Sequence, residues 1–254
     1  MIQVSISHPH VEVILNGPEG KPFTIDYSQL NELEETLATI EVAIQEQGIR
    51  LVVIKSSSPK FFCVGANINA LKELDANTIE VWVRSGHRVF NRLENLSVPT
   101  VALVNGYTMG GGLELALCCD FIYAGPKAQF SQSEARLGFI PGWGGTRRLP
   151  DRIGSQQAKQ LYYSGEMIDA QRGRAIGLVD QNGELDELNE TLHRFEKSVC
   201  ENSPSALAHY KAIIQGKQSA ARDRNTDEEA ALSISCMKNP DTMQRIDAFL
   251  NRKK

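Results

Sequence analysis

Hydrophobic positions along the chain follow two different spacings. Near the N-terminus, Val4–Ser7 alternates apolar and polar residues, and Val11–Leu15 follows before the turn sequence Asn16–Gly20. These two segments are predicted to be β-strands. From Asp26 the apolar residues are spaced by three or four positions, at Leu30, Leu33, Leu37, Ile40 and Ile44, and Gly48 follows. That spacing predicts a helix with one buried face that ends at the glycine.

Strands and helices then continue in turn. Three short apolar runs are typical of buried strands: Leu51–Ile54, Thr100–Val104 and Phe121–Ala124. Helices are expected over Thr78–Asn95, from Gly110 through Cys119, and near Gly154. The alternation predicts an α/β core. Neither a Gly-x-Gly-x-x-Gly motif after an early strand nor a P-loop is present, which argues against a Rossmann or P-loop nucleotide site.

The strand patterns stop after about residue 200. Ser203-Pro204 is typical of a helix start, Thr226–Glu229 resembles a capping box, and Asn239-Pro240 begins a third helix before the basic tail Arg252–Lys254. We therefore expect an α/β core over residues 1–200 and a helical C-terminal subdomain over residues 201–254.

Composition and charge narrow the class of protein. Hydrophobic residues make up 41% of the 254 residues and charged residues 23%, which suits a packed core. A membrane span needs about 18 consecutive apolar residues, and the sequence has no such stretch. Since Met1–Val4 also lacks the start of a signal region, a cytoplasmic location is expected. The net charge of −4 argues against a nucleic-acid partner.

Cysteine and histidine do not suggest a metal site. The five cysteines include no Cys-x-x-Cys pair, and the five histidines are dispersed. An odd number of cysteines does not make a full disulfide framework, so buried thiols are expected at Cys63, Cys118, Cys119, Cys200 and Cys236.

Three stretches carry residues suited to chemistry. Gly65–Ile68 is predicted to open a helix, where unpaired backbone N–H groups can bind an anion or a developing oxyanion. Gly110–Gly112 precedes Glu114 in a helix that is apolar nearly all round, and a buried carboxylate needs partners or a function. Glu134 lies in a glycine-rich run. The alternatives are an ordinary strand-to-helix turn, a capping or solvated Glu114, and a surface pair between Glu134 and Arg136.

Taken together and in this order, the three stretches resemble the signature of the crotonase (enoyl-CoA hydratase/isomerase) family. The matching residues are Gly65–Ile68, Gly110–Leu115 and Glu134–Thr146, and both glutamates of the two-glutamate hydratases are present. Two positions differ from the family pattern. Asn67 stands where the family has Asp, and Lys21–Thr24 replaces an early Asn-Ala turn.

The resemblance implies a spiral of repeated ββα units with a helical C-terminal subdomain. It also implies that the backbone N–H groups of Ala66 and Gly111 form an oxyanion hole for a thioester carbonyl. Glu114 and Glu134 are then the catalytic pair that holds a water molecule. By analogy Glu134 donates the proton to Cα and Glu114 activates the water, although the sequence alone does not fix these roles.

The same resemblance implies the ligands and partners. The substrate is an acyl-CoA thioester that contacts Ala66, Asn67, Ile68 and Gly111, and CoA enters only as part of it, without a further cofactor or metal. Lys21, Lys60 and Lys211 are candidate cations for its phosphates. A homotrimer or homohexamer is expected, with the helical tail in subunit contacts.

Hydration of a 2-enoyl-CoA is the predicted reaction, with alternatives from within and outside the family. A Δ3–Δ2 enoyl-CoA isomerase, or a hydrolase or decarboxylase of acyl-CoAs, would use the same oxyanion hole. A non-catalytic acyl-CoA-binding or scaffold protein is the alternative of a different class. The presence of both glutamates favours hydration.

Overall fold

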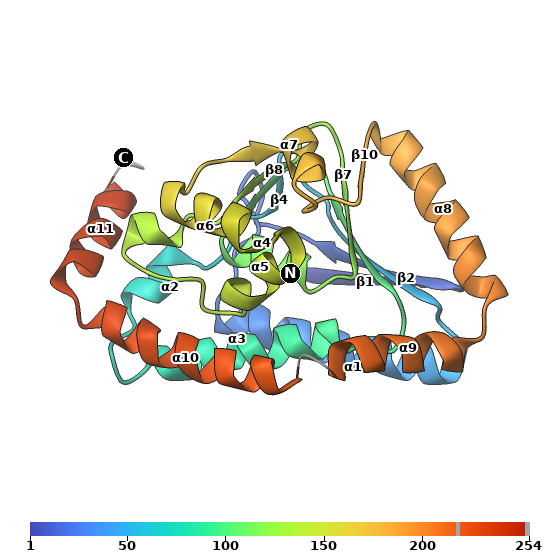
Figure 1. The fold of residues 1–254 in the computed structure, drawn as a ribbon, viewed down its shortest axis with the longest axis horizontal. Helices are drawn as coiled ribbons and strands as arrows, with labels where there is room; N and C mark the ends of the chain where they lie inside the picture. Colours follow the sequence, from blue (N-terminus) through green and yellow to red (C-terminus); the bar gives the residue numbers. More distant parts are fainter. Residues whose placement is uncertain (217–218, 252–254) are drawn as a thin grey trace.

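Two β-sheets lie at the centre of the computed structural model, which describes residues 1–216 and 219–251 (Figure 1). The larger sheet has the strand order β1-β2-β3-β5-β7-β10 and the smaller one β4-β6-β8-β9. The strands are β1 (Ile2–Ser7), β2 (His10–Leu15), β3 (Leu51–Ser56), β4 (Phe61–Cys63), β5 (Thr100–Val104), β6 (Tyr107–Met109), β7 (Phe121–Ala124), β8 (Gln129–Ser131), β9 (Ile168–Asp169) and β10 (Gln181–Asn182).

Helices surround these sheets. They are α1 (Tyr27–Gln47), α2 (Ile68–Lys72), α3 (Ile79–Glu94), α4 (Gly111–Leu117), the 3₁₀ helix η1 (Glu134–Leu137), α5 (Gly145–Ile153), α6 (Ser155–Ser164), α7 (Ala170–Ala175), α8 (Leu185–Glu201), α9 (Pro204–Gly216), α10 (Ser219–Met237) and α11 (Pro240–Asn251).

A ββα unit is repeated three times in the chain. The first strands of the units, β3, β5 and β7, are parallel neighbours in the larger sheet. The second strands, β4, β6 and β8, are parallel neighbours in the smaller sheet. Each strand pair leads into helical structure: α2 and α3, then α4, then η1 and α5. This arrangement confirms the predicted α/β fold of repeated ββα units.

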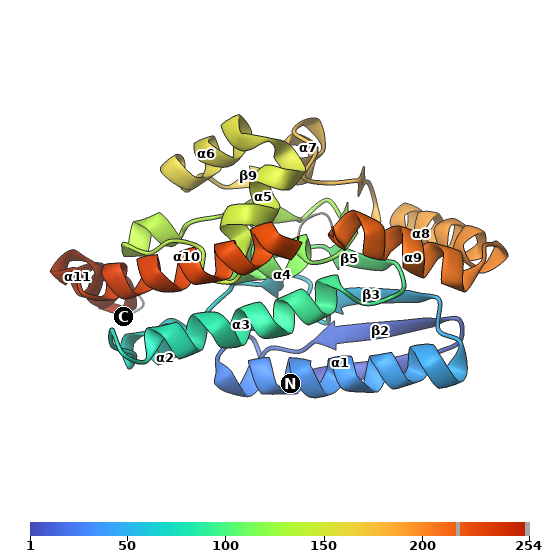
Figure 2. The ribbon, with the colours of Figure 1, turned by 60° about the horizontal axis from the view of Figure 1, so that its bottom comes forward.

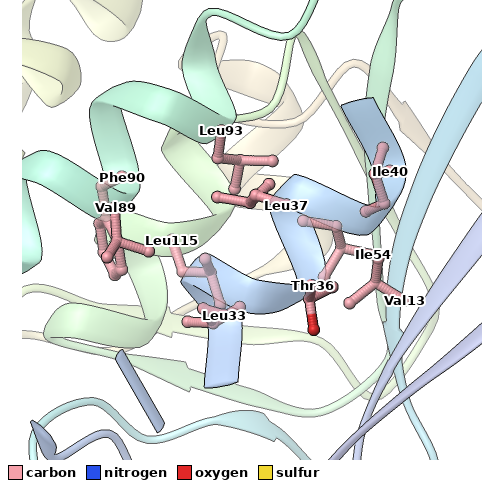
Figure 3. Close-up of a pocket in the computed structure, with 10 residues that line it drawn as sticks. All are labelled: Val13, Leu33, Thr36, Leu37, Ile40, Ile54, Val89, Phe90, Leu93 and Leu115. Atoms are coloured by element: carbon pink, nitrogen blue, oxygen red, sulfur yellow. The ribbon is translucent and has the colours of Figure 1, made fainter. Parts of the chain in front are cut away.

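The central strands of the larger sheet send successive side chains to opposite faces, and both of these faces are covered. In β3, Val52 and Ile54 join the main core with α1 and α3, while Leu51 and Val53 pack with Leu188 of α8 on the other face. Figure 3 shows leucines of α1 and α3 around a small apolar cavity, with Val13 and Ile54 from the sheet and Leu115 from α4. The core therefore holds α4 directly against α1 and α3.

Most predicted helix boundaries agree with the structure, and two do not. Asp26 caps α1, and Gly48 ends it in the left-handed conformation. The helix expected to run through Cys119 ends at Leu117, because the N–H groups of Cys118 and Cys119 form tighter bonds to Leu115 and Ala116. The expected helix start at Thr226–Glu229 is wrong, since α10 begins at Ser219 and continues through it.

A tertiary contact explains the second error. The Thr226 hydroxyl contacts His87 Nδ1 at 3.1 Å instead of capping a helix, and Glu229 is buried in the protein. A capping box starts a helix only where the chain before it is not already helical. Here α10 is helical before Thr226 and contacts α3, so the local pattern of Thr226–Glu229 does not start a helix.

The C-terminal part of the chain is helical. After β10 the described residues form α8 to α11, and α10 runs alongside α3 (Figures 1 and 2). The predicted start of a helix at Pro240 is confirmed, whereas the basic tail at 252–254 lies outside the described residues. The division at residue 200 stays a prediction. Among the helices described, none combines the length and the apolar character that crossing a membrane requires.

Three of the five cysteines are buried as expected. Burial raises the pKa of the Cys63 thiol and of the Cys118 thiol to about 12, so both remain protonated at neutral pH. Cys236 is half-buried, and Cys200 is exposed near the end of α8. The prediction of a buried thiol is therefore wrong for Cys200.

A buried ion pair joins α3 to α5. Glu94, the last residue of α3, accepts hydrogen bonds from Arg147 at 2.8 Å and from Arg148 at 3.0 Å. Burial acts to raise the pKa of Glu94, but the charges and hydrogen bonds of Arg148 and Arg147 outweigh it and lower the pKa to about 2. Glu94 therefore stabilises the fold as a carboxylate between two arginines.

We predict that Glu94→Gln lowers the free energy of unfolding by about 3–5 kcal/mol, because two buried guanidinium groups lose the carboxylate that lies between them, although Arg147 keeps Asp151 at 3.6 Å. Urea denaturation followed by circular dichroism measures the change. The exposed Glu80, which pairs with Arg84, is the control, and Glu80→Gln should cost less than about 0.5 kcal/mol. The pKa of Glu94 in the folded protein lies below the ordinary value of 4.5. The ion pair therefore contributes fully to the free energy of unfolding above pH 4.5, and this contribution disappears as the pH falls toward 2. Equal effects of the two variants would contradict the assignment.

Candidate active site

The three stretches singled out in the sequence meet at one edge of the smaller sheet. Strands β4, β6 and β8 are parallel neighbours, so their carboxyl ends lie side by side. Gly65–Ala66 follows β4, Gly110–Gly111 follows β6, and Glu134 follows β8. The topology therefore brings together residues that are far apart in the sequence.

Backbone lies against backbone where the first two stretches meet. A Cβ atom on Gly65 would lie 2.8 Å from the nitrogen of Gly111, and Gly65 has a φ of +86° that favours glycine. A Cβ atom on Gly112 would lie 2.0 Å from the carbonyl oxygen of Cys63. The glycines are required here because α4 begins in direct contact with the end of β4.

Two backbone N–H groups point to this meeting point. Ala66 forms a parallel bridge with Ile25, made by the carbonyl of Gly65 and the N–H of Asn67, each at 2.8 Å. In such a bridge the N–H of the middle residue, Ala66, points away from the strand of Ile25. Gly111 is the first residue of α4, so its N–H has no partner within the helix. The arrangement suits binding of a carbonyl oxygen that gains negative charge.

Glu114 is buried in the first turn of α4, with 2% of its surface exposed. Its Oε1 atom accepts hydrogen bonds from the backbone N–H groups of Trp143, at 2.8 Å, and Gly145, at 2.7 Å. Burial raises the pKa of Glu114 well above its ordinary value, and the nearby charges of Glu134 and Glu229 add to the shift. The two N–H donors oppose the rise because they stabilise the carboxylate.

Glu134 is the first residue of η1, and its carboxyl group faces inward. Oε1 accepts a hydrogen bond from Gln132 Nε2 at 2.8 Å, and a Cβ atom on Gly110 would lie 3.1 Å from the same oxygen. Oε2 is buried and has no hydrogen-bond partner among the residues that the structure describes. Burial raises the pKa of Glu134 to about 7, although the hydrogen bond from Gln132 acts to lower it. A surface pair with Arg136 is not formed, because exposed Arg136 turns toward the Ser164 carbonyl.

The two glutamates interact electrostatically, so they titrate as a pair and one of them can hold a proton while the other is charged. A pair of this kind can remove a proton from one reacting atom and deliver a proton to another.

The remaining predicted contact residues are divided between two places. Asn67 caps α2 and donates to Asp26 Oδ2 at 3.2 Å, and Ile68 is the first residue of α2. Exposed Lys21 lies just before the segment at Phe23 that bonds to Val64. Lys211 lies elsewhere: its Nζ donates to Asp120 at 2.7 Å and to the Val98 carbonyl at 2.9 Å, beyond the C-terminal end of α4. It is therefore separated from Gly111 by the length of that helix.

The sequence analysis missed several residues that touch the site. Gln132 holds Glu134, and the Tyr162 hydroxyl donates to the Gly145 carbonyl at 2.6 Å. Gln132 could have been suspected, since it stands two positions before Glu134 in the same stretch. No sequence signal identifies Tyr162, which comes from α6. Within residues 1–216 and 219–251, no three His, Cys, Asp or Glu side chains gather as a metal site.

Comparisons with known proteins identify the family of the chain. The model of the enoyl-CoA hydratase/isomerase family matches residues 12–254. A crotonyl-CoA hydratase of Syntrophomonas wolfei is 33% identical over 87% of this chain and 86% of its own length. A short-chain-enoyl-CoA hydratase of Clostridium acetobutylicum is 32% identical over 95% of this chain and 91% of its own.

Solved structures share the fold. An enoyl-CoA hydratase from Bacillus anthracis aligns with a TM-score of 0.78 and 29% identity, covering 99% of this chain and 96% of that one. A second, from Bacillus halodurans, has a TM-score of 0.90 over 97% of this chain and 99% of that one, and at 23% identity it shows the fold alone. With its ββα repeats, its glycine contacts and its two inward glutamates, the chain belongs to the enoyl-CoA hydratase/isomerase family, that is, to the crotonases.

Proposed function

We propose that this protein is an enoyl-CoA hydratase, which adds water across the 2,3 double bond of a 2-enoyl-CoA thioester. The observation that carries the proposal is a pair of glutamates, Glu114 buried and Glu134 with a buried carboxyl oxygen, beside the meeting point of β4 and α4. The names of the crotonyl-CoA and short-chain-enoyl-CoA hydratases, which are about a third identical to this chain, favour short acyl groups.

In the proposed reaction the thioester oxygen accepts hydrogen bonds from the N–H groups of Ala66 and Gly111. Negative charge moves onto this oxygen as water adds at Cβ, and each donor contributes about 3 kcal/mol to its stabilisation. The protein's own packing requires the glycines beside these donors, since a Cβ atom would lie 2.8 Å from the Gly111 nitrogen if placed on Gly65 and 2.5 Å from the Trp143 ring if placed on Gly111. The enolate-like state then collapses as Cα receives a proton.

The hydrogen bonds of the two glutamates favour different roles for them. Two N–H donors stabilise the negative charge on Glu114, so Glu114 is the carboxylate that takes a proton from water. Glu134 accepts from Gln132, and its other carboxyl oxygen is buried without a partner among the described residues, so we assign it the proton that goes to Cα. This division agrees with the roles that the family resemblance implies.

For the CoA part of the substrate, Lys21 precedes the segment Phe23–Ile25 that bonds to the chain on either side of Ala66. Lys60 lies at the opposite, N-terminal end of β4, where its carbonyl bonds to Tyr107, and Lys211 is engaged by Asp120. We propose Lys21 as the first phosphate contact to test. No separate cofactor is part of the proposed reaction. A cytoplasmic location also stays a prediction.

Isomerisation is the alternative reaction, since it passes through the same enolate. One relative, from Mycosarcoma maydis, carries both activities in its name, enoyl-CoA isomerase/hydratase. The purified protein should be assayed with 2-enoyl-CoA thioesters of increasing chain length, by loss of enoyl absorbance and by product mass. Hydration adds the mass of one water molecule. If only a 3-enoyl-CoA is converted, to a product of unchanged mass, the protein is an isomerase.

We predict that Glu114→Gln and Glu134→Gln each lower kcat by about 10²–10⁴-fold with little change in KM, because both groups act mainly in the transition state. Steady-state kinetics with the best 2-enoyl-CoA measures this. The control is Glu35→Gln, which removes one charge from an exposed position of α1 and should leave kcat unchanged. Near-normal turnover in either active-site variant would end the two-carboxylate assignment.

A second prediction addresses the oxyanion hole. Ala66→Pro removes the N–H group of Ala66 and should lower kcat by about 10²–10³-fold, with CoA binding little affected. Ala66→Ser keeps the backbone N–H and has a side chain of similar size, so it serves as the control. Circular dichroism checks that both variants fold. Full turnover in a folded Ala66→Pro variant would show that this turn does not bind the carbonyl.

We also propose that the chain assembles as a trimer or a hexamer through its C-terminal helices. No residue of α9, all of which are described, is buried, and Tyr210, Ile213 and Ile214 expose large apolar side chains. Such a surface suits a subunit contact better than water.

Light scattering should therefore give a trimer or hexamer mass at micromolar concentration. The double variant Ile213→Glu/Ile214→Glu should shift the mass toward the monomer, whereas Val81→Glu, at an exposed position of α3, should not. A monomeric wild-type protein would refute the assembly.

A further inference from the structure

The segment Trp143–Thr146 gives its backbone N–H groups alternately to two different carboxylates. Trp143 and Gly145 donate to Glu114, at 2.8 and 2.7 Å. Gly144 and Thr146, the residues between and after them, donate to Glu229, at 2.9 and 3.2 Å. Because alternate N–H groups point to opposite sides, the two carboxylates hold one segment of backbone between them.

Glu229 is as deeply buried as the proposed catalytic base. It is 1% exposed, and besides the two N–H groups it contacts the Thr146 hydroxyl and His87 Nε2, the latter at 2.8 Å. Gly144 and Thr146 lie at the start of α5, whose first N–H groups have no partner within the helix. Gly144, the N-cap residue of α5, has no side chain that could cap the helix. Glu229, from the distant helix α10, caps it instead.

The surroundings fix the position of Glu229. His87, on α3, is 2% exposed, and its other ring nitrogen, Nδ1, lies 3.1 Å from the hydroxyl of Thr226. Asn225 donates to the Thr146 hydroxyl at 2.6 Å. Three residues of α10, Asn225, Thr226 and Glu229, are therefore bonded to the loop or to His87.

The carbonyl groups of the same segment are held separately. Arg148 donates to the Trp143 carbonyl at 2.6 Å, and Tyr162 donates to the Gly145 carbonyl at 2.6 Å. Loss of Glu229 would leave these bonds in place, so the segment would stay near its position. Loss of Glu229 would, however, remove the hydrogen bonds that hold the segment on the side opposite Glu114. The two N–H groups that orient Glu114 would then no longer be fixed. A misplacement of about 1 Å at a reacting group can reduce the rate about 10²-fold.

We propose that Glu229 is a positioning residue for Glu114, which acts by holding the Trp143–Thr146 backbone, and that α10 thereby completes the active site. The inference rests on the proposed hydratase function, since it concerns the geometry of the base in that reaction. Glu229 itself contacts neither the oxyanion hole nor Glu134 through any hydrogen bond of the described residues.

The first test is Glu229→Gln, which keeps the size of the side chain. An amide has one acceptor oxygen, so it cannot accept from Gly144 and Thr146 on both of its arms. We expect kcat to fall about 10–100-fold with KM changed less than about threefold. The control is Glu228→Gln, which removes the same charge from the adjacent, exposed position of α10 and should leave kcat within about twofold.

A double-mutant cycle with Glu114→Gln decides whether Glu229 acts through Glu114. If it does, Glu229→Gln lowers kcat strongly in the wild-type background and by less than about twofold in the Glu114→Gln background. An equal fall in both backgrounds would overturn the inference, because the loss would then be independent of the base. The same result would leave the hydratase assignment intact.

Tryptophan fluorescence gives a readout that does not depend on turnover. The chain has two tryptophans, Trp82 and Trp143, whose rings lie 5.4 Å apart, and Trp143 precedes the residue that donates to Glu229. Glu229→Gln should change the emission spectrum, and Glu228→Gln should not. An unchanged spectrum together with unchanged kcat would also overturn the inference.

The outcomes separate the two proposals. If wild-type protein hydrates no enoyl-CoA, or if Glu114→Gln retains full turnover, the proposed function fails. If Glu114→Gln is impaired and Glu229→Gln is not, the positioning role alone fails. Should Glu229→Gln not fold, Thr146→Val takes its place, since it removes one donor to Glu229 and should lower kcat to a smaller extent, again only when Glu114 is present.

Discussion

The direct contact between the backbone after β4 and the backbone that begins α4 is the constraint on which the rest of the site depends. With the carbonyl of Cys63 against Gly112 and the Cα of Gly65 against Gly111, no side chain fits between the two segments. This contact fixes the direction of α4, and the direction of α4 fixes where Glu114 enters the core. The same contact leaves two N–H groups without partners in regular structure, and a polar ligand can use them.

Carboxyl groups in an apolar interior destabilise the folded protein unless they form hydrogen bonds, and here most of the donors are backbone N–H groups. Four consecutive N–H groups of Trp143–Thr146 serve Glu114 and Glu229. Glu134 instead accepts from the side-chain amide of Gln132 and from its own backbone N–H. The supply of donors thus differs between glutamates that lie near one another, and this difference is what allows one to remain charged while another holds a proton.

The α/β order and the three functional stretches could be predicted from the sequence, because their signals are local. Leu51–Ile54 and Thr100–Val104 are apolar runs. Gly110–Gly112 would destabilise a helix, so three glycines are expected there only if another group approaches the backbone closely. Thr226–Glu229 is wrongly predicted as a helix start because a capping box is also a local pattern. Here tertiary contacts to α3 hold α10, and a local pattern does not reveal them. The roles of Gln132 and Tyr162, and the separation of Lys211 from the site, follow from packing between distant segments, which one sequence does not encode visibly.

The position of Glu229 in the chain has a consequence for folding. Its bonds join residues 85 positions apart, to Gly144, and 142 positions apart, to His87. Contacts over such separations form late, since the loop between them must first be closed. The sheets and their nearby helices can therefore be complete while the Trp143–Thr146 segment beside Glu114 still lacks its bonds to Glu229. We expect a refolding chain to recover its ellipticity before its activity, with the pace of maturation set by docking of the last quarter of the chain.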